Sequence, residues 1–132
     1  MIMVNHLKLN LQVSKLTGQI QLKASNIGAG HSIPTGIYGD TALFLEFSVM
    51  MGAKTVFFRE ERLSYQDNTA IPVDGHRIFF YNFRAKPGEN YTLKARAIFN
   101  SSSHLEDKVL DEVELPLKIN SRGSNKKKFL LQ

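Results

Sequence analysis

The chain has 132 residues, enough for one hydrophobic core and too few for two domains of ordinary size. Its composition, 42% hydrophobic and 22% charged, excludes the disordered class, so the chain is expected to fold alone. The formal net charge is +5 and there is no cysteine, which excludes disulfides, thiolate metal sites, iron-sulfur clusters and covalently attached haem.

The chain begins with two stretches in which apolar and polar residues alternate. Residues 7–13 place Leu and Val in one phase and Lys, Asn and Gln in the other, and residues 20–24 repeat this pattern. Such alternation predicts strands with one buried and one solvated face. The turn at Thr17-Gly18 predicts that the two strands form a hairpin. A long loop rich in glycine is then expected over residues 26–40.

The rest of the chain repeats the strand pattern, interrupted by turn clusters rich in Gly, Pro, Asn and Asp. The further expected strands are residues 42–49, 55–59, 77–83, 91–99 and 112–119. Pro116 has no backbone N–H, so the last strand is expected at the edge of a sheet. The expected fold is therefore all-β, an antiparallel two-sheet sandwich of about seven strands, immunoglobulin-like, over residues 1–119. A barrel of the same strands is the alternative.

Residues 120–132 are expected to form a basic polar tail. Residues 118–132 hold five basic residues and no acid, while the remaining chain is electrically neutral. Such a charge run is typical of a solvated segment, so no nucleic-acid partner is expected. No apolar stretch approaches the roughly 20 residues of a membrane helix, and the residues after Met1 do not resemble a signal peptide. We therefore expect no membrane insertion and no export signal in this chain.

The loop around His31 is the only segment whose composition exceeds what a sandwich loop requires. Glycines permit positive φ or close backbone approach, and a proline fixes φ and restrains the residue before it. The residues expected to shape the loop are Asn26, Gly28, Gly30, Pro34, Thr35 and Gly36. The imidazole of His31 could ligate a metal or a haem iron, carry a proton, or brace the loop through hydrogen bonds. The glycine spacing matches neither a dinucleotide fingerprint nor a phosphate loop.

The run Gly-Ala-Gly-His-Ser-Ile-Pro-Thr-Gly at residues 28–36 resembles the Gly-His-x-x-Pro-Thr-Gly loop of a known domain family. That family is the C-terminal β-sandwich domain of bacterial multihaem c-type cytochromes, and the similarity extends over roughly residues 5–119. The resemblance implies a non-catalytic accessory module of an electron-transfer protein, docking on a haem-bearing domain or subunit. It makes His31 a candidate axial ligand for the partner's haem and implies a periplasmic or cell-envelope parent protein.

This chain departs from the family because it has no Cys-x-x-Cys-His motif, so no cofactor is expected in the chain itself. The alternative function is a free-standing immunoglobulin-like adhesion or ligand-binding module whose glycine-rich loop is purely structural. Either function makes the chain a binding module and not an enzyme.

Other candidate sites are weak. His6, His76 and His104 lack the spacing of a metal site, so no metal ligand is expected among them. Glu60 and Glu61 are neighbours on a strand, where alternation sends adjacent side chains to opposite faces. The Ser101-Ser102-Ser103-His104 run has no nucleophile elbow.

The number of aromatic residues is larger than one sandwich core needs. We expect some of them on the outer faces of their strands, as a docking surface. The residues concerned are Phe44, Phe57, Phe79, Tyr81 and Phe83.

Overall fold

The computed structural model describes residues 6–14, 16–34, 42–65, 67–100 and 108–118. Within these ranges the secondary structure is seven strands without a helix. The strands are β1 (Leu7–Val13), β2 (Ile20–Asn26), β3 (Ala42–Met51), β4 (Lys54–Leu63), β5 (His76–Tyr81), β6 (Asn90–Asn100) and β7 (Lys108–Lys118).

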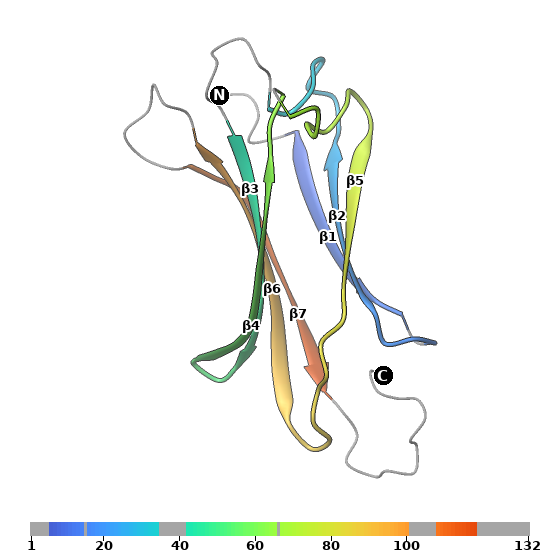
Figure 1. Ribbon diagram of the computed structural model, residues 1–132, viewed down its shortest axis with the longest axis vertical. Helices are drawn as coiled ribbons and strands as arrows, with labels where there is room; N and C mark the ends of the chain where they lie inside the picture. Colours follow the sequence, from blue (N-terminus) through green and yellow to red (C-terminus); the bar gives the residue numbers. More distant parts are fainter. Residues whose placement is uncertain (1–5, 15, 35–41, 66, 101–107, 119–132) are drawn as a thin grey trace.

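The strands form two antiparallel sheets that pack face to face (Figure 1), which confirms the expected all-β sandwich. One sheet has the order β1-β2-β5 and the other the order β4-β3-β6-β7. Immunoglobulin constant domains place the fourth strand on the sheet of the first, second and fifth strands. Here β4 pairs with β3 instead, so the arrangement is an immunoglobulin-like sandwich with an enlarged second sheet.

The strand pattern of the sequence matches most of this structure. The β1–β2 hairpin is confirmed, and β7 lies at a sheet edge, as Pro116 predicted. Most predicted boundaries differ from the structure by one or two residues, and two differ by four. The predicted fourth strand stopped at residue 59, but β4 continues to Leu63, and β7 begins at Lys108 instead of residue 112. Both missed segments belong to edge strands, which tolerate charged side chains because those side chains reach water.

The core lies between the sheets and is built from the inward phase of each strand. Phe47 of β3 stacks on Tyr81 of β5, with ring centroids 4.7 Å apart and planes 1° apart. Aliphatic side chains of the other five strands complete this core, together with further aliphatic side chains of β3, while β5 contributes aromatic side chains only. The stack joins the two sheets directly, because the strands carrying the two rings belong to different sheets.

The structure places one of the five aromatic residues concerned on an outer strand face, and a docking role for that face stays a prediction. Tyr81 is buried, and Phe57, Phe79 and Phe83 pack against the core, so only Phe44 lies on an outer face. The exposed aromatic side chains on strands include Phe58 and Phe80, the direct neighbours of Phe57 and Phe79. Both phases of β4 and β5 carry Phe, and the sequence alone did not indicate which phase points inward.

Candidate functional site

Asn26 anchors the glycine-rich loop at one end of the sandwich. It is the last residue of β2, and only 1% of its surface is exposed. Its Nδ2 donates hydrogen bonds to the carbonyl oxygens of His31 (2.8 Å) and Ile71 (3.2 Å), and its Oδ1 accepts one from the Ala29 N–H (3.3 Å). A buried amide with three partners is nearly satisfied and fixes the backbone that it contacts. Asn26 therefore holds the loop against the β4–β5 connection.

A backbone bridge reinforces this anchor. The Ile33 N–H donates to the Ile71 carbonyl (3.0 Å), and the Ile71 N–H donates to the Ile33 carbonyl (2.7 Å). Both isoleucine side chains are fully buried, and so is Pro34, whose peptide bond with Ile33 is cis. The loop is thus tied to the core on either side of His31.

Two of the predicted loop-shaping glycines adopt backbone conformations that side chains disfavour. Gly28 has φ +92° and Gly30 has φ +82°. Residues with a Cβ rarely adopt such angles. The sequence-predicted Thr35 and Gly36 lie outside the described residues.

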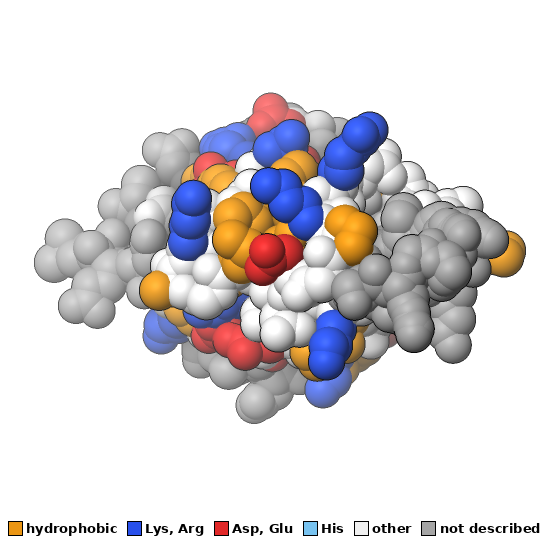
Figure 2. All heavy atoms as spheres, turned by 90° about the horizontal axis from the view of Figure 1, so that it is seen from below, with side chains coloured by type: hydrophobic (Ala, Val, Ile, Leu, Met, Phe, Trp, Pro, Cys, Tyr) orange, Lys and Arg blue, Asp and Glu red, His pale blue; other side chains and the backbone are white. Residues whose placement is uncertain are grey.

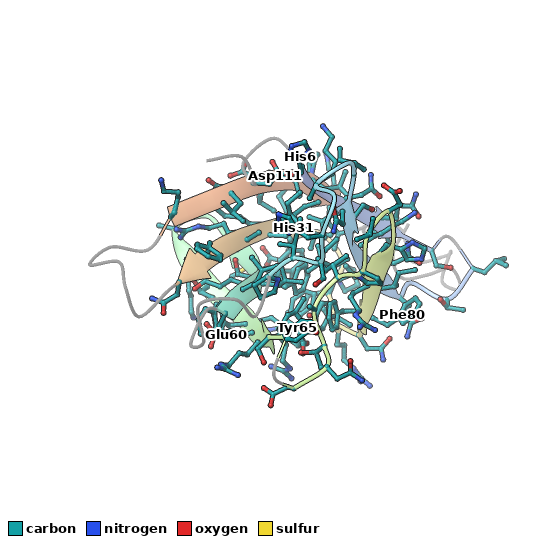
Figure 3. The ribbon with its side chains drawn as sticks, turned by 90° about the horizontal axis from the view of Figure 1, so that it is seen from above. His6, His31, Glu60, Tyr65, Phe80 and Asp111 are labelled. Atoms are coloured by element: carbon teal, nitrogen blue, oxygen red, sulfur yellow. The ribbon has the colours of Figure 1, made fainter. Side chains whose placement is uncertain are left out.

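His31 lies on the solvent-facing side of this loop. In Figure 3, which looks onto this end of the sandwich, His31 is near the middle of the view, with His6 and Asp111 to one side. The side chain is exposed, and its Nδ1 lies 2.9 Å from the Ser32 carbonyl oxygen. A carbonyl oxygen can only accept a hydrogen bond, so Nδ1 carries the proton in this contact. The lone pair of the neutral ring is therefore on Nε2, which points away from the Ser32 contact.

His6 makes a similar contact at the same end. Its Nδ1 lies 3.1 Å from the Ile27 carbonyl oxygen, and its own carbonyl accepts the Ile27 N–H at 2.8 Å. His6 is half-buried, whereas His31 is exposed. The two residues are therefore similar in tautomer and differ in access from solvent.

The other candidates from the sequence do not assemble into a site. His76 is exposed at the start of β5, and the Ser101–His104 run lies outside the described residues. Glu60 points to solvent, while Glu61 accepts a hydrogen bond of 2.8 Å from the Tyr81 hydroxyl. Burial, followed by the hydrogen bond and charge of Glu61, raises the pKa of Tyr81 well above its usual value. In the described part of the chain, no three His, Asp or Glu side chains are grouped to hold a metal ion.

Sequence reasoning missed a feature at the opposite end of the sandwich. The Tyr91 hydroxyl, near the start of β6, accepts a hydrogen bond of 3.0 Å from the Lys86 N–H. This contact corresponds to the tyrosine corner of immunoglobulin-like domains, in which a Tyr at this strand bonds to the backbone a few residues upstream. The signal was present in the sequence, because Tyr91 follows the Pro87-Gly88 turn as the first apolar residue of an alternating strand.

Comparisons with known proteins give no further assignment. No known protein family matches the chain, and no curated protein is similar enough in sequence to count as a relative. None of the described residues belongs to a helix long and apolar enough to cross a membrane.

Proposed function

We propose that this chain is a non-catalytic β-sandwich module that docks on a haem-bearing domain or subunit and offers His31 Nε2 as an axial ligand. The observation that carries the proposal is the contact between His31 Nδ1 and the Ser32 carbonyl, on an exposed ring. Histidines that ligate metals almost always donate their other ring N–H to a carbonyl or carboxylate, which fixes the tautomer and the ring orientation.

The residues present fit the role of supplying one ligand to a haem, but not that of attaching the haem. Without cysteine the chain has no means of attaching haem c covalently, so the haem must belong to the partner. A histidine nitrogen in the sixth coordination position makes the iron low-spin and influences its reduction potential. His31 supplies that nitrogen, and the sandwich supplies its position.

The anchoring of the loop supports a presenting role for His31 instead of a bracing role. The bonds that hold the loop come from the buried Asn26 side chain and from the backbone of Ile33. The imidazole of His31 contributes one contact, to the adjacent residue, at an exposed position. A ligand held on a fixed backbone loses little conformational freedom on binding, which favours affinity.

The proposal is tested by titrating the chain into a c-type haem peptide that has one histidine axial ligand and one open axial position. Imidazole coordination converts the haem from high spin to low spin, which its absorption spectrum reports. We expect saturable conversion by the wild-type chain and at least about tenfold weaker conversion by His31→Ala, a difference of about 1.4 kcal/mol. Thermal melting of both proteins checks that the variant is folded.

His76→Ala is the matched control, because His76 is also an exposed histidine near one end of a strand. It should titrate like the wild-type chain. Equal conversion by His31→Ala and the wild-type chain would refute the proposal. If His6→Ala lost the conversion while His31→Ala kept it, the ligand would be His6, and the role proposed for His31 would be refuted.

A further inference from the structure

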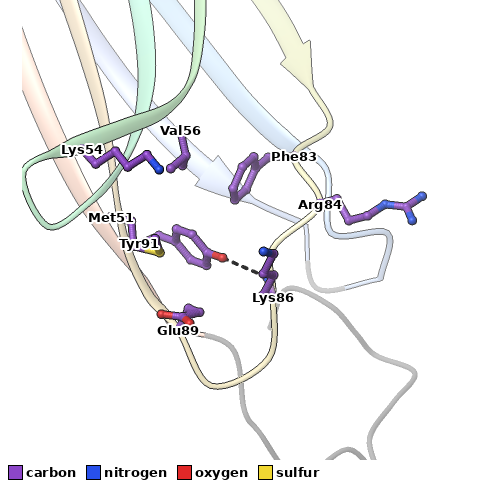
Figure 4. A pocket seen from close by; sticks show the side chains of 8 residues that line it. All are labelled: Met51, Lys54, Val56, Phe83, Arg84, Lys86, Glu89 and Tyr91. Atoms are coloured by element: carbon purple, nitrogen blue, oxygen red, sulfur yellow. Dashed lines mark hydrogen bonds between the residues drawn. The ribbon is translucent and has the colours of Figure 1, made fainter.

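A pocket lies at the end of the sandwich opposite to the His31 loop. It opens where the β3–β4 turn faces the segment that leads from β5 into β6 (Figure 1 and Figure 4), and its volume is about 280 Å³. Its floor consists of buried or half-buried side chains, namely Met51, Val56, Phe83 and Tyr91. Its rim consists of exposed charged side chains, namely Lys54, Arg84, Lys86 and Glu89.

The floor of the pocket is preformed by aromatic contacts. The Phe83 ring meets the Tyr91 ring edge to face, with centroids 5.1 Å apart, and meets the Phe57 ring in the same way at 5.6 Å. Edge-to-face pairs of this kind are favourable beyond their buried area. The hydrogen bond from the Lys86 N–H to the Tyr91 hydroxyl holds the facing wall. A ligand entering here meets a shape that is already ordered, which lowers the entropic cost of binding.

The charges of the rim favour an anion. Three cationic residues and one acidic residue line the pocket, a net charge of +2, and in Figure 4 the Arg84 side chain extends away from the other lining side chains. Within the described residues, none of Lys54, Arg84 and Lys86 forms an ion pair. Figure 2, which looks at this end of the molecule, shows Lys and Arg side chains around apolar side chains. A concave surface with an excess of positive charge attracts a ligand of the opposite sign.

The Tyr91 hydroxyl adds a directional donor. Its oxygen accepts the Lys86 N–H, so its own hydrogen is left to donate. No described residue accepts that hydrogen. An anionic oxygen at the mouth of the pocket would therefore meet both cations and a hydroxyl donor.

We propose that this pocket binds a small organic carboxylate with an apolar body about the size of one aromatic ring. The apolar floor excludes an inorganic anion as the best ligand, because such an ion would leave that surface uncovered. The volume is just below the range of about 300–1,000 Å³ that drug-sized ligands occupy, so the ligand must be smaller. This site is separate from the proposed haem docking and is the feature that a ligand-binding module would use.

The test uses phenylacetate as the probe and records backbone amide shifts of the whole chain by NMR. We expect saturable shifts near the pocket, with a dissociation constant of about 1 mM or below. Phenylacetamide, which has the same shape without the charge, should bind at least about fivefold more weakly, as expected for loss of about 1 kcal/mol from an exposed ion pair.

Variants of the charged rim residues sharpen the test, because removing a cation and removing the carboxylate should change the affinity for phenylacetate in opposite directions. Lys54→Gln and Lys86→Gln should each weaken phenylacetate binding about twofold to fivefold, whereas Glu89→Gln should strengthen it. Lys8→Gln, which changes an exposed lysine of β1 far from the pocket, should have no effect. These substitutions lie at exposed positions and should leave the fold intact.

Three results would overturn the assignment. The first is the absence of localised shifts at about 20 mM phenylacetate, far above the expected constant. The second is equal binding of phenylacetate and phenylacetamide. The third is tighter binding of an acidic peptide at this end together with no binding of phenylacetate, which would make the surface a protein-docking site.

Discussion

The buried side-chain amide of Asn26 donates a hydrogen bond of 2.8 Å to the carbonyl oxygen of His31, the residue proposed to ligate haem. The same amide donates to the Ile71 carbonyl, so one side chain joins the end of β2, the glycine-rich loop and the β4–β5 connection. The position of the exposed imidazole therefore depends on a residue in the core.

Asn26→Ala is expected to lower the free energy of unfolding by about 1–3 kcal/mol, because the part-buried His31 carbonyl loses its donor and the Ala29 N–H loses its acceptor. For a domain of this size the melting temperature should fall by several degrees. Asn10→Ala is the matched control, since Asn10 is an exposed asparagine on the neighbouring strand β1. Similar melting temperatures for the two variants would contradict the anchoring role.

Asp111→Ala is expected to destabilise the sandwich through the edge of β1. The Asp111 carboxylate accepts a hydrogen bond of 2.8 Å from the Leu9 N–H, which joins β7 of one sheet to β1 of the other. The pairing register of β6 and β7 shifts directly beside Asp111, between Ala97 and Ile98, and such irregularities redirect side chains.

Removal of the Asp111 carboxylate should cost about 1–3 kcal/mol in urea denaturation, because the partly buried Leu9 N–H loses its acceptor. Asp111→Asn keeps an acceptor oxygen and should cost less. Glu112→Ala, at the exposed adjacent position, serves as the control. A cost for Glu112→Ala as large as that for Asp111→Ala would show that the strand, and not this bond, is sensitive.

The raised pKa of Tyr81 predicts that the folded chain loses stability at alkaline pH. The folded state raises the pKa of Tyr81 above the value of about 10 in the unfolded chain, so the unfolded state loses its proton first. The stabilisation is therefore complete below pH 10 and declines as the pH rises from about 10 toward the raised folded-state pKa.

Urea denaturation at pH 8 and pH 11 measures this effect when the wild-type chain is compared with Tyr81→Phe. The variant should be less stable at pH 8 by about 1–2 kcal/mol, because it lacks the bond to Glu61. The difference should shrink at pH 11. Tyr65→Phe, at an exposed tyrosine, should show no such change. A constant difference for Tyr81→Phe between the two pH values would contradict this prediction.

The parts of the fold that the sequence predicted correctly are those in which one strand face is apolar and the other polar. The β1–β2 hairpin and the position of β7 at an edge follow from local patterns around residues 7–24 and from Pro116. The charged half of β4 was missed because residues 59–62 are all charged and have no apolar phase, which an edge strand tolerates. The inward phase of Phe57 was not predictable either, since it depends on a ring contact with Phe47 on the paired strand β3.

The candidate site was predictable only in its local parts. Asn26 and the glycines were identified from composition. In the structure the glycines have positive φ angles, and Asn26 forms hydrogen bonds within the loop. The partner of Asn26 at Ile71 is 45 residues away, and no local pattern indicates such a contact. The pocket at the other end is built from two segments, residues 51–56 and 83–91, so its charges and rings come together only in the folded chain.

The most direct test of the central claim is the protonation of the His31 ring, measured by nitrogen NMR of the chain labelled in its histidines. At a pH where the ring is neutral, the hydrogen bond to the Ser32 carbonyl requires the proton on Nδ1 and the lone pair on Nε2. We expect the His31 Nδ1 signal of a protonated nitrogen and the Nε2 signal of an unprotonated one, with Nε2 changing when the haem peptide is added. A proton found on Nε2, with Nδ1 bearing the lone pair, would contradict the account, because the accessible nitrogen could not ligate iron as proposed.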